Sequence, residues 1–390
     1  MIKTKLGVFF GGKSVEHDIS IISALQIMNK LDEDKYDIVP VYVNKEGVFF
    51  TGEALLDVTN YKVISELEKK ATEVFFTATS NDPFLYPKKT GLLSKAKPIE
   101  IDLIFPIFHG TLGEDGCFQG LFEIKNLPYV GSDVFSSALC MNKFELKEIL
   151  KQAGISVVEG ITISKRSWFF DKAFIETKIN EIGFPLIVKP NNLGSSVGVS
   201  AAHNMEELED ALNNAFQFAE KTIVEKFIKE NRELNCAVYG NAAEQHLSLI
   251  EEPFKGDTLL SFDNKYKDDI NSFSGMSGLK RKVPADITKE MEVEVHEMAR
   301  KAYITSGCGG MVRIDFIVDT SDNKVYLNEI NTIPGSLAYY LWPDTTPYRQ
   351  ILDQMIVNAV KRKEEKEEYN YDFPSYIFEQ SDISLNKFQK

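Results

Sequence analysis

Three strand-like segments near the start of the chain restrict its fold more than any other feature. Residues 4–10 (TKLGVFF) predict a buried strand, which Gly11 and Gly12 end just before a stretch of helical apolar spacing. Further strands are predicted at 36–47 and 101–110, and the last of these is apolar almost throughout. Strand, helix and strand in this order favour a parallel sheet with helices on its faces, in a first domain of about 130 residues.

The chain must contain more than this domain, because 390 residues exceed what one ordinary core accommodates. A second unit begins with helical apolar spacing over 136–155 and continues as strand, Gly/Ser turn and strand over 184–202. Further helices are predicted at 205–219 and 287–305. Residues 51–98 mix charge, proline and glycine without a clear period, and we expect an insertion or a lid-like hairpin there.

Charge and hydropathy argue against two classes of partner. A net charge of −14 and the lack of a long Lys/Arg run argue against nucleic acid. No stretch approaches the roughly 20 apolar residues of a membrane helix, and we expect neither a signal peptide nor a membrane partner. The four cysteines, Cys117, Cys140, Cys236 and Cys308, are scattered without zinc-ligand spacing. A reducing cytoplasm fits this composition best.

Two apolar strand-like segments flank a turn rich in Asp, Ser and Asn at 319–323, which predicts a β-hairpin. In the register set by this turn, Asp315 lies opposite Glu329. Arg313 then lies opposite Asn331, and strand alternation brings all four side chains to one face.

This polar group on apolar strands predicts a site rather than a simple turn. Two carboxylates and an amide oxygen are ligands that suit magnesium, and a guanidinium beside them suits a phosphate or an oxyanion. A surface salt-bridge cluster is the alternative. It explains less well why the neighbouring residues are apolar, since buried strands rarely carry unpaired carboxylates.

The segment LIVKPNNLGSSVGVS runs from an apolar strand through Lys189 into a loop with Gly194 and Gly198. Glycines let backbone N–H groups approach an anion closely, and the loop serines add donors. The Walker A order is absent, and a plain glycine-containing hairpin is the alternative. Free backbone groups after the strand end at Glu225 could contact an adenine edge, with Glu233 on ribose hydroxyls.

Taken in order, these motifs resemble the ATP-grasp superfamily. The match runs through Lys143, KPNNLGSSVG, VEKFIKENRE, VRIDF and NEINTIPG. From residue 4 to about 360 the chain is similar to the D-alanine:D-alanine ligase family. The segments typical of this narrower family are GVFFGGKSVEHDISIISA, FHGTLGEDGCFQG and NKY at 264–266.

The resemblance implies an α/β, three-domain ATP-grasp fold with a parallel-sheet N-terminal domain. The implied parts are a substrate domain at 1–132, a central ATP-grasp subdomain at 133–224, a C-terminal catalytic domain at 225–368 and a tail at 369–390. ATP lies between the second and third domains. The family is cytoplasmic and homodimeric, and it uses two magnesium ions, for which manganese can substitute.

The implied activity is that of an ATP-dependent carboxylate-amine ligase. One D-alanine carboxylate is phosphorylated to an acyl phosphate, which the amine of a second D-alanine attacks. The products are D-alanyl-D-alanine, ADP and phosphate, and the dipeptide serves peptidoglycan synthesis and hence the cell wall and cell shape. D-amino acids and ATP are therefore the implied partners.

The resemblance also implies roles residue by residue. Lysines hold the ATP phosphates, a serine loop closes over the γ-phosphate and a strand end frames the nucleoside. The implied ATP-binding residues are Lys143, Lys189, Ser196, Glu225, Lys226, Phe227, Ile228, Glu233 and Lys265. The implied metal ligands are Asp315, Glu329 and Asn331. On residue type alone, Lys143 is more often a solvated surface lysine.

Further roles concern the two amino acid substrates. Arg313 and the N–H of Gly335 are the implied oxyanion site. Glu16 matches the carboxylate that binds the first ammonium, although an acid at a helix start is also favoured by the dipole. His109 matches a substrate-pocket histidine, whereas a lone histidine is more often structural. Tyr340, discussed below, occupies the position of a second-substrate ligand.

The NKY segment matches a loop that folds over the phosphates. Lys265 belongs to it, and Tyr266 matches a tyrosine that links Glu16 with the catalytic serine, here Ser195. In the family this tyrosine accompanies dipeptide formation rather than ester formation. We therefore expect an amine as the second substrate.

The match breaks after NTIPG, where the family has a serine that holds the carboxylate of the second substrate. Tyr340 occupies that position in SLAYYLW, and a phenol is longer than a serine side chain. Either the tyrosine reaches the carboxylate from a shifted backbone or the second pocket differs. A ligase of the same mechanism for D-serine or another amino acid is therefore the main alternative.

Two other classes are weighed against these. A nucleotide-binding protein without activity has no need for three metal ligands together with Arg313. A biotin-carboxylase-like enzyme does not have this N-terminal signature or the NKY loop.

Overall fold

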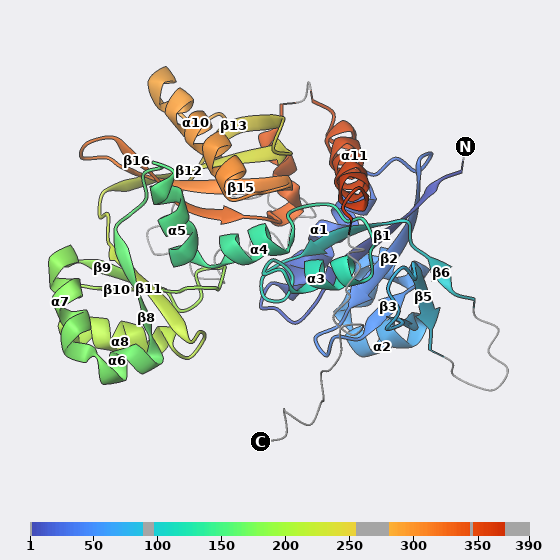
Figure 1. The fold of residues 1–390 in the computed structure, drawn as a ribbon, viewed down its shortest axis with the longest axis horizontal. Helices are drawn as coiled ribbons and strands as arrows, with labels where there is room; N and C mark the ends of the chain where they lie inside the picture. The colour runs from blue at the N-terminus through green and yellow to red at the C-terminus, as the bar shows by residue number, and fades with distance from the viewer. Residues whose placement is uncertain (1, 89–96, 255–280, 344–345, 371–390) are drawn as a thin grey trace, which may run out of the picture.

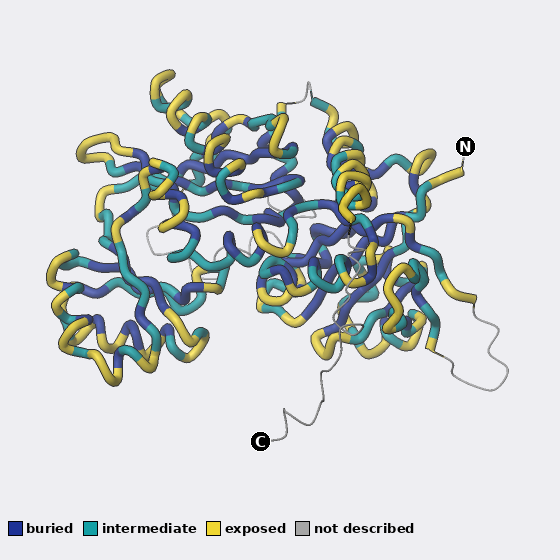
Figure 2. Tube along the Cα trace, in the orientation of Figure 1, coloured by how far each residue is buried: buried dark blue, intermediate teal, exposed yellow. Residues whose placement is uncertain are grey.

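The computed structural model describes residues 2–88, 97–254, 281–343 and 346–370. The strands in these ranges form three sheets of seven, four and five strands. In Figure 1 the seven-stranded sheet lies on the right, the four-stranded sheet at the lower left and the five-stranded sheet at the upper left. Buried residues follow the strands of all three sheets, and the outer helices and turns carry the exposed ones (Figure 2).

The parallel core expected at the N-terminus is confirmed. β1 (Thr4–Gly11) lies between β2 (Tyr36–Val43) and β7 (Leu103–Phe108), and both pairings are parallel. α1 (His17–Met28) follows β1 and contacts both β1 and β7. β7 is buried along its whole length, as a strand covered on both faces must be.

Residues 51–98 extend this sheet instead of covering it. Four antiparallel strands continue outward from β2: β3 (Phe49–Thr51), β4 (Thr72–Phe76), β5 (Phe84–Pro87) and β6 (Ile99–Glu100). Between β3 and β4 lie η1 (Glu53–Leu56), η2 (Val58–Lys62) and α2 (Ile64–Lys70). The expected hairpin is therefore β4–β5. Its apolar side chains, such as Phe76 stacked on Phe9, hold it in the sheet.

The four-stranded sheet is antiparallel throughout, in the order β10-β9-β11-β8. Its strands are β8 (Gly160–Ser164), β9 (Leu186–Pro190), β10 (Ser200–Ala202) and β11 (Lys221–Lys226). Its helices are α6 (Lys165–Phe170), α7 (Lys172–Ile182) and α8 (Met205–Ala215). The predicted strand, turn and strand over 184–202 are β9 and β10. The last turn predicted for the helix at 205–219 is not helical.

The five-stranded sheet is also antiparallel, in the order β14-β13-β12-β15-β16. Its strands are β12 (Asn231–Gly240), β13 (Gln245–Pro253), β14 (Arg281–Lys282), β15 (Gly310–Asp319) and β16 (Lys324–Asn331). α10 (Lys289–Thr305) packs on one face, where Val295, Ala299 and Tyr303 are buried. η4 (Gly335–Leu341) and α11 (Tyr348–Glu367) follow β16.

Residues 136–155 form two helices and not the single helix that their periodicity predicts. α4 (Val134–Met141) ends and α5 (Lys143–Gln152) begins at Asn142, whose backbone is extended (φ −94°, ψ 93°). The first two N–H groups of α5 donate to the backbone and side-chain oxygens of Asn191, each at 2.9 Å. A residue distant in sequence therefore caps α5. A third short helix, α3 (Cys117–Ile124), precedes this pair.

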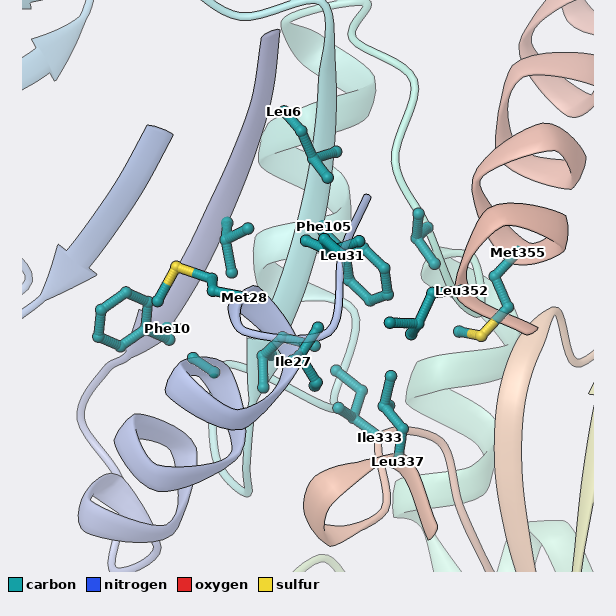
Figure 3. Close-up of a cluster of buried hydrophobic side chains, with 14 of the residues drawn as sticks. Leu6, Phe10, Ile27, Met28, Leu31, Phe105, Ile333, Leu337, Leu352 and Met355 are labelled. Atoms are coloured by element: carbon teal, nitrogen blue, oxygen red, sulfur yellow. The ribbon is translucent and has the colours of Figure 1, made fainter. Parts of the chain in front are cut away.

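One apolar cluster joins the first sheet to the end of the chain (Figure 3). It combines strands β1 and β7 and helix α1 with the segment after β16 and with α11. The labelled members are Leu6, Phe10, Ile27, Met28, Leu31, Phe105, Ile333, Leu337, Leu352 and Met355. Polar contacts support the same packing, since Tyr36 donates to Asp353 at 2.9 Å and Arg362 donates to the carbonyls of Tyr129 and Gly131, each at 2.6 Å.

None of the helices within the described ranges has both the length and the apolar character needed to span a membrane.

The cluster predicts how two substitutions in α11 differ. Leu352 is fully buried, so Leu352→Ala should destabilise the fold by roughly 2–5 kcal/mol, through lost burial and the cavity left behind. Val357 on the same helix is 43% exposed, and Val357→Ala should change stability by less than about 0.5 kcal/mol. Urea unfolding followed by circular dichroism measures both, and equal effects would contradict the assigned packing.

Candidate active site

The hairpin register predicted from the turn is confirmed. Arg313 pairs with Asn331, and Asp315 pairs with Glu329, across β15 and β16. Arg313 donates two parallel hydrogen bonds to the carboxylate of Asp315, at 2.7 and 2.8 Å, and Asn331 donates a third at 3.0 Å. The side chains of Arg313 and Asp315 are only 15% exposed, so this group is not a surface salt-bridge cluster. Burial alone would lower the pKa of Arg313, but its interactions, mainly with the charge of Asp315, outweigh burial, and the pKa is raised.

A β-bulge next to this pair turns one more polar side chain toward the site. Asp315 pairs with Glu329 while Phe316 pairs with Leu327, so Asn328 is the extra residue. Bulges commonly redirect a side chain in this way. The amide oxygen of Asn328 accepts a hydrogen bond from Lys189 at 3.3 Å, which ties the hairpin to the four-stranded sheet.

A row of polar residues crosses four strands of the five-stranded sheet. Glu251 pairs with Asn235, Asn235 pairs with Asp315, and Asp315 pairs with Glu329. Asn235 also donates to Glu251 at 2.8 Å. Asn235 and Glu251 are not among the residues predicted from the sequence. Their signal is a polar residue inside an otherwise apolar strand, which is costly without a partner.

Three charged residues form a buried cluster between α5 and the four-stranded sheet. Glu225 is 1% exposed, and its carboxylate contacts the ammonium groups of Lys147 and of Lys189, the latter at 2.9 Å. Burial alone would raise the pKa of Glu225, but the charges of the two lysines outweigh it and lower the pKa. Lys147 is not among the residues predicted from the sequence. It lies four residues after Lys143, so both lysines lie on one face of α5.

Lys143 connects the Gly/Ser loop with the hairpin. Its ammonium donates to the carbonyl of Leu193 at 2.8 Å and lies 3.6 Å from the carboxylate of Glu329. The side chain is 12% exposed, so Lys143 is not a solvated surface lysine. Of the two lysines predicted to bind phosphate, Lys189 thus lies near the end of β9 and Lys143 at the start of α5.

The Gly/Ser loop reaches the start of α1. Ser195 donates a hydrogen bond to the carboxylate of Glu16, and a side chain at Gly194 would lie 3.3 Å from the same carboxylate. Both loop serines have a positive φ, 56° for Ser195 and 57° for Ser196, which is a strained conformation outside glycine. Glu16 occupies the N-cap of α1 but does not cap the helix through its side chain. Its carboxylate points to the loop.

The loop after β7 closes another side of the site. His109 is buried, its ring lies 3.1 Å from the hydroxyl of Ser23, and burial lowers its pKa. Glu114, which the sequence analysis did not select, accepts from the N–H of Gly110 at 2.8 Å and from that of Ile333 at 3.0 Å. Burial, together with the nearby charge of Glu16, raises the pKa of Glu114 to about 8. Glu114 thus ties this loop to the segment after β16.

That segment turns sharply at Gly335. Ser336, Leu337 and Ala338 all have a positive φ, between 48° and 50°. The hydroxyl of Ser23 accepts from the N–H of Ser336 at 3.0 Å, and Ser336 donates to the side chain of Gln26. Contacts with α1 therefore hold a conformation that these residue types disfavour.

All three sheets contribute to one cavity, which encloses about 820 Å³ of space including solvent at its mouth. Eight predicted site residues line it: Glu16, His109, Lys143, Ser195, Arg313, Glu329, Asn331 and Gly335. Asp315 is not in this lining but bonds to Arg313 and Asn331, which are. Lys189 and Glu225 are one step further away, since Lys189 bonds to Asn328, next to Glu329, and Glu225 contacts Lys189. Glu114, Cys140 and Met141 also line the cavity.

The remaining predicted residues lie elsewhere. Lys226 donates to three carbonyl groups at the end of α7, at 3.0 to 3.4 Å, so its ammonium is committed to that helix. The backbone of Phe227 bonds to Pro185, and the carbonyl of Ile228 accepts from Asn231 at 2.6 Å. Glu233 lies near the start of β12, and Ser196 is exposed on its loop. Lys265 and Tyr266 lie outside the described residues.

Tyr340 does not belong to the described lining of the cavity. Its hydroxyl donates to Glu251 at 3.3 Å, and the guanidinium of Arg281 lies 4.0 Å from the centre of its ring. Arg281 also contacts Glu251, at 3.2 Å. Burial, followed by the charge of Glu251, raises the pKa of Tyr340 to about 12. Tyr340 thus joins the end of the polar row next to the site.

Two family models match this chain. One is described as D-ala D-ala ligase N-terminus and matches residues 5–132, and the other as D-ala D-ala ligase C-terminus and matches residues 149–357. A protein of Thermosipho melanesiensis named D-alanine--D-alanine ligase is 39% identical over 362 residues, which cover 93% of this chain and 95% of that protein.

Solved structures agree. The D-alanine-D-alanine ligase from Coxiella burnetii superposes with a TM-score of 0.76 at 31% identity, covering 94% of this chain and 96% of that one. The VanG D-Ala:D-Ser ligase from Enterococcus faecalis gives a TM-score of 0.77 at 29% identity, covering 92% and 100%. Since the two family models account for most of its length, this chain belongs to the D-alanine–D-alanine ligase family and has its ATP-grasp fold.

Proposed function

We propose that this protein joins two D-alanines at the expense of ATP, through an acyl phosphate, and so makes the dipeptide for peptidoglycan. The observation that supports this most is the cavity in which groups for all three substrates meet. Glu16 and His109 come from the first unit, Lys143 and Ser195 from the second, and Arg313 from the five-stranded sheet. Relatives named D-alanine--D-alanine ligase support the same activity.

The side chains suit the steps of this reaction. Glu16 binds the ammonium of the first D-alanine, which places its carboxylate near Arg313. Lys143 and Lys189 hold the phosphates of ATP, and the loop with Ser195 covers them. As the second amine attacks the acyl phosphate, Arg313 and the N–H of Gly335 stabilise the negative charge that develops on oxygen.

The hairpin fits magnesium by its donor set. Asp315 and Glu329 face each other across two strands, and Asn331 joins them, which gives hard oxygen ligands in one place. When bound there, two magnesium ions, or manganese in their place, would neutralise phosphate charge during transfer. Arg313 holds the carboxylate of Asp315 in a fixed orientation through its two hydrogen bonds.

Further parts of the proposal rest on the family resemblance. We assign a substrate domain to 1–132, a central ATP-grasp subdomain to 133–224 and a catalytic domain to 225–368, with ATP between the last two and a tail at 369–390. The protein is proposed to act in the cytoplasm as a homodimer, without a nucleic-acid or membrane partner.

The second substrate has one further candidate, D-serine. The chain has Tyr340 where the family has a serine, and one similar structure is a D-Ala:D-Ser ligase. Tyr340 is fixed by Glu251 and Arg281 beside Arg313, at the end of the polar row next to the cavity. We favour D-alanine, because relatives 39% and 36% identical over most of the chain are named D-alanine--D-alanine ligase.

The metal assignment predicts a large difference between two aspartates of β15. Asp315→Asn should lower phosphate release with D-alanine and ATP by about 100-fold or more, because a charged ligand next to the reacting phosphate is lost. It should also raise the magnesium concentration needed for half-maximal rate. Asp319→Asn, at the far end of the strand where the carboxylate contacts Ser321, should keep the rate. A coupled assay for phosphate release measures both, and an active Asp315→Asn protein would refute the assignment.

The second pocket predicts a selective effect at Tyr340. Tyr340→Phe removes the hydroxyl that bonds to Glu251, a loss of about 0.5–1.5 kcal/mol, and should raise KM for the second D-alanine several-fold while KM for ATP stays constant. Tyr339→Phe, on the adjacent tyrosine, is the matched control.

The same assay with D-alanine plus D-serine, D-lactate or L-alanine identifies the second substrate. If phosphate release did not require D-alanine, the proposed function would fail.

A further inference from the structure

Two cysteines far apart in sequence meet at the edge of the cavity. The sulfur atoms of Cys140 and Cys308 are 3.7 Å apart, although 168 residues separate them in the chain. Cys140 lies in the last turn of α4, and Cys308 lies between α10 and β15. The two residues are only 4% and 5% exposed.

We propose that Cys140 and Cys308 form a reversible disulfide when the protein meets hydrogen peroxide. The sulfurs are in contact, and each must move by less than about 1 Å to reach bonding distance. Disulfides of this kind in reducing compartments are usually transient and act as redox sensors.

An oxidant can reach the pair through the cavity. Cys140 lines the cavity together with Met141 and Lys143, and peroxide is small enough to enter this cavity. Cys308 contacts Cys140 there, and either thiol can be the donor. This contact, with a further one between Cys308 and Ser306 at 3.2 Å, lowers the pKa of Cys308 and raises that of Cys140, so Cys308 is the thiol that ionises more readily.

The chemistry is balanced with peroxide as the oxidant. One thiolate attacks a peroxide oxygen, which breaks the O–O bond and yields a sulfenic acid and hydroxide. The second thiol loses its proton to that hydroxide, which becomes water, and attacks the sulfenic sulfur. The S–S bond forms as the S–O bond breaks, and the hydroxide that leaves takes up the proton that the first thiol released on ionising. Two thiols and one peroxide thus give one disulfide and two waters.

The position of Cys140 connects this bond to the proposed function. Asn142 and Lys143 follow Cys140 directly, and α5 begins at this joint. A bond to Cys308 would pull the last turn of α4 toward Cys308. Because Asn142 connects α4 to α5, this would shift the start of α5 and with it Lys143. This consequence, a higher KM for ATP in the oxidised protein, rests on the proposed function, whereas formation of the bond does not.

The remaining cysteines provide controls. Cys236 is fully buried and its sulfur contacts Ser248, so it shares the burial of the pair but not its arrangement. Cys117 is exposed. Oxidation that followed exposure alone would therefore occur first at Cys117.

The test is oxidation of the full-length protein with hydrogen peroxide, without nucleotide. Titratable thiols in denaturant should fall from four to two, the intact mass should fall by two hydrogen atoms, and a peptide spanning Cys140 and Cys308 should appear under non-reducing conditions. Dithiothreitol should restore all four thiols. Cys308→Ser should abolish the linked peptide and Cys236→Ser should retain it, with basal activity unchanged in both.

Protection by ATP adds a second readout. ATP with magnesium should slow the loss of thiols in the wild type, because it fills the cavity that Cys140 lines. The proposal is overturned if the linked peptide fails to form, or if the mass rises by oxygen atoms at Cys117 while Cys140 and Cys308 stay reduced. The thiol count, the intact mass and the linked peptide can all be measured without ligase activity. They therefore test the disulfide even if the proposed function is wrong.

Discussion

The burial of Ile333 and Leu337 against α1 positions the rest of the site. These two side chains belong to the segment that follows the carboxylate hairpin, and they pack into the core of the first sheet. Their burial fixes the end of β16 relative to the start of α1. Glu16, at that start, and Gly335, in that segment, therefore line the same cavity. Apolar contacts thus set the geometry in which the polar groups meet.

Buried charge is the second constraint on this structure. Glu225 lies between two lysines, Glu251 contacts Arg281, and Asp315 is held by Arg313. Removing charges from water is costly, and a buried pair contributes little net stability unless its geometry is good. An unpaired member would cost far more than the pair provides. These pairs are therefore better explained by a need for charge at the site than by stability.

The sequence predicted those parts of the site that depend on local rules. The register of the hairpin follows from strand alternation and one short turn, and the parallel sheet follows from the order of its elements. The break at Asn142 could not be predicted, because the residue that caps α5 is Asn191, which is distant in sequence. Lys147 carries no local sign of burial. The contacts of Tyr340 depend on Arg281, which no periodicity connects with it.

The last helix has a consequence for how the protein is made. Leu352 and Met355 of α11 pack in the same core as residues of β1 and α1, so the first sheet lacks part of its interior until α11, which is synthesised later, is available. Until then this sheet carries exposed apolar surface. Transiently exposed apolar surface of this kind makes a folding chain prone to aggregation. The core around β1 is therefore completed only by a helix more than 300 residues further along the chain.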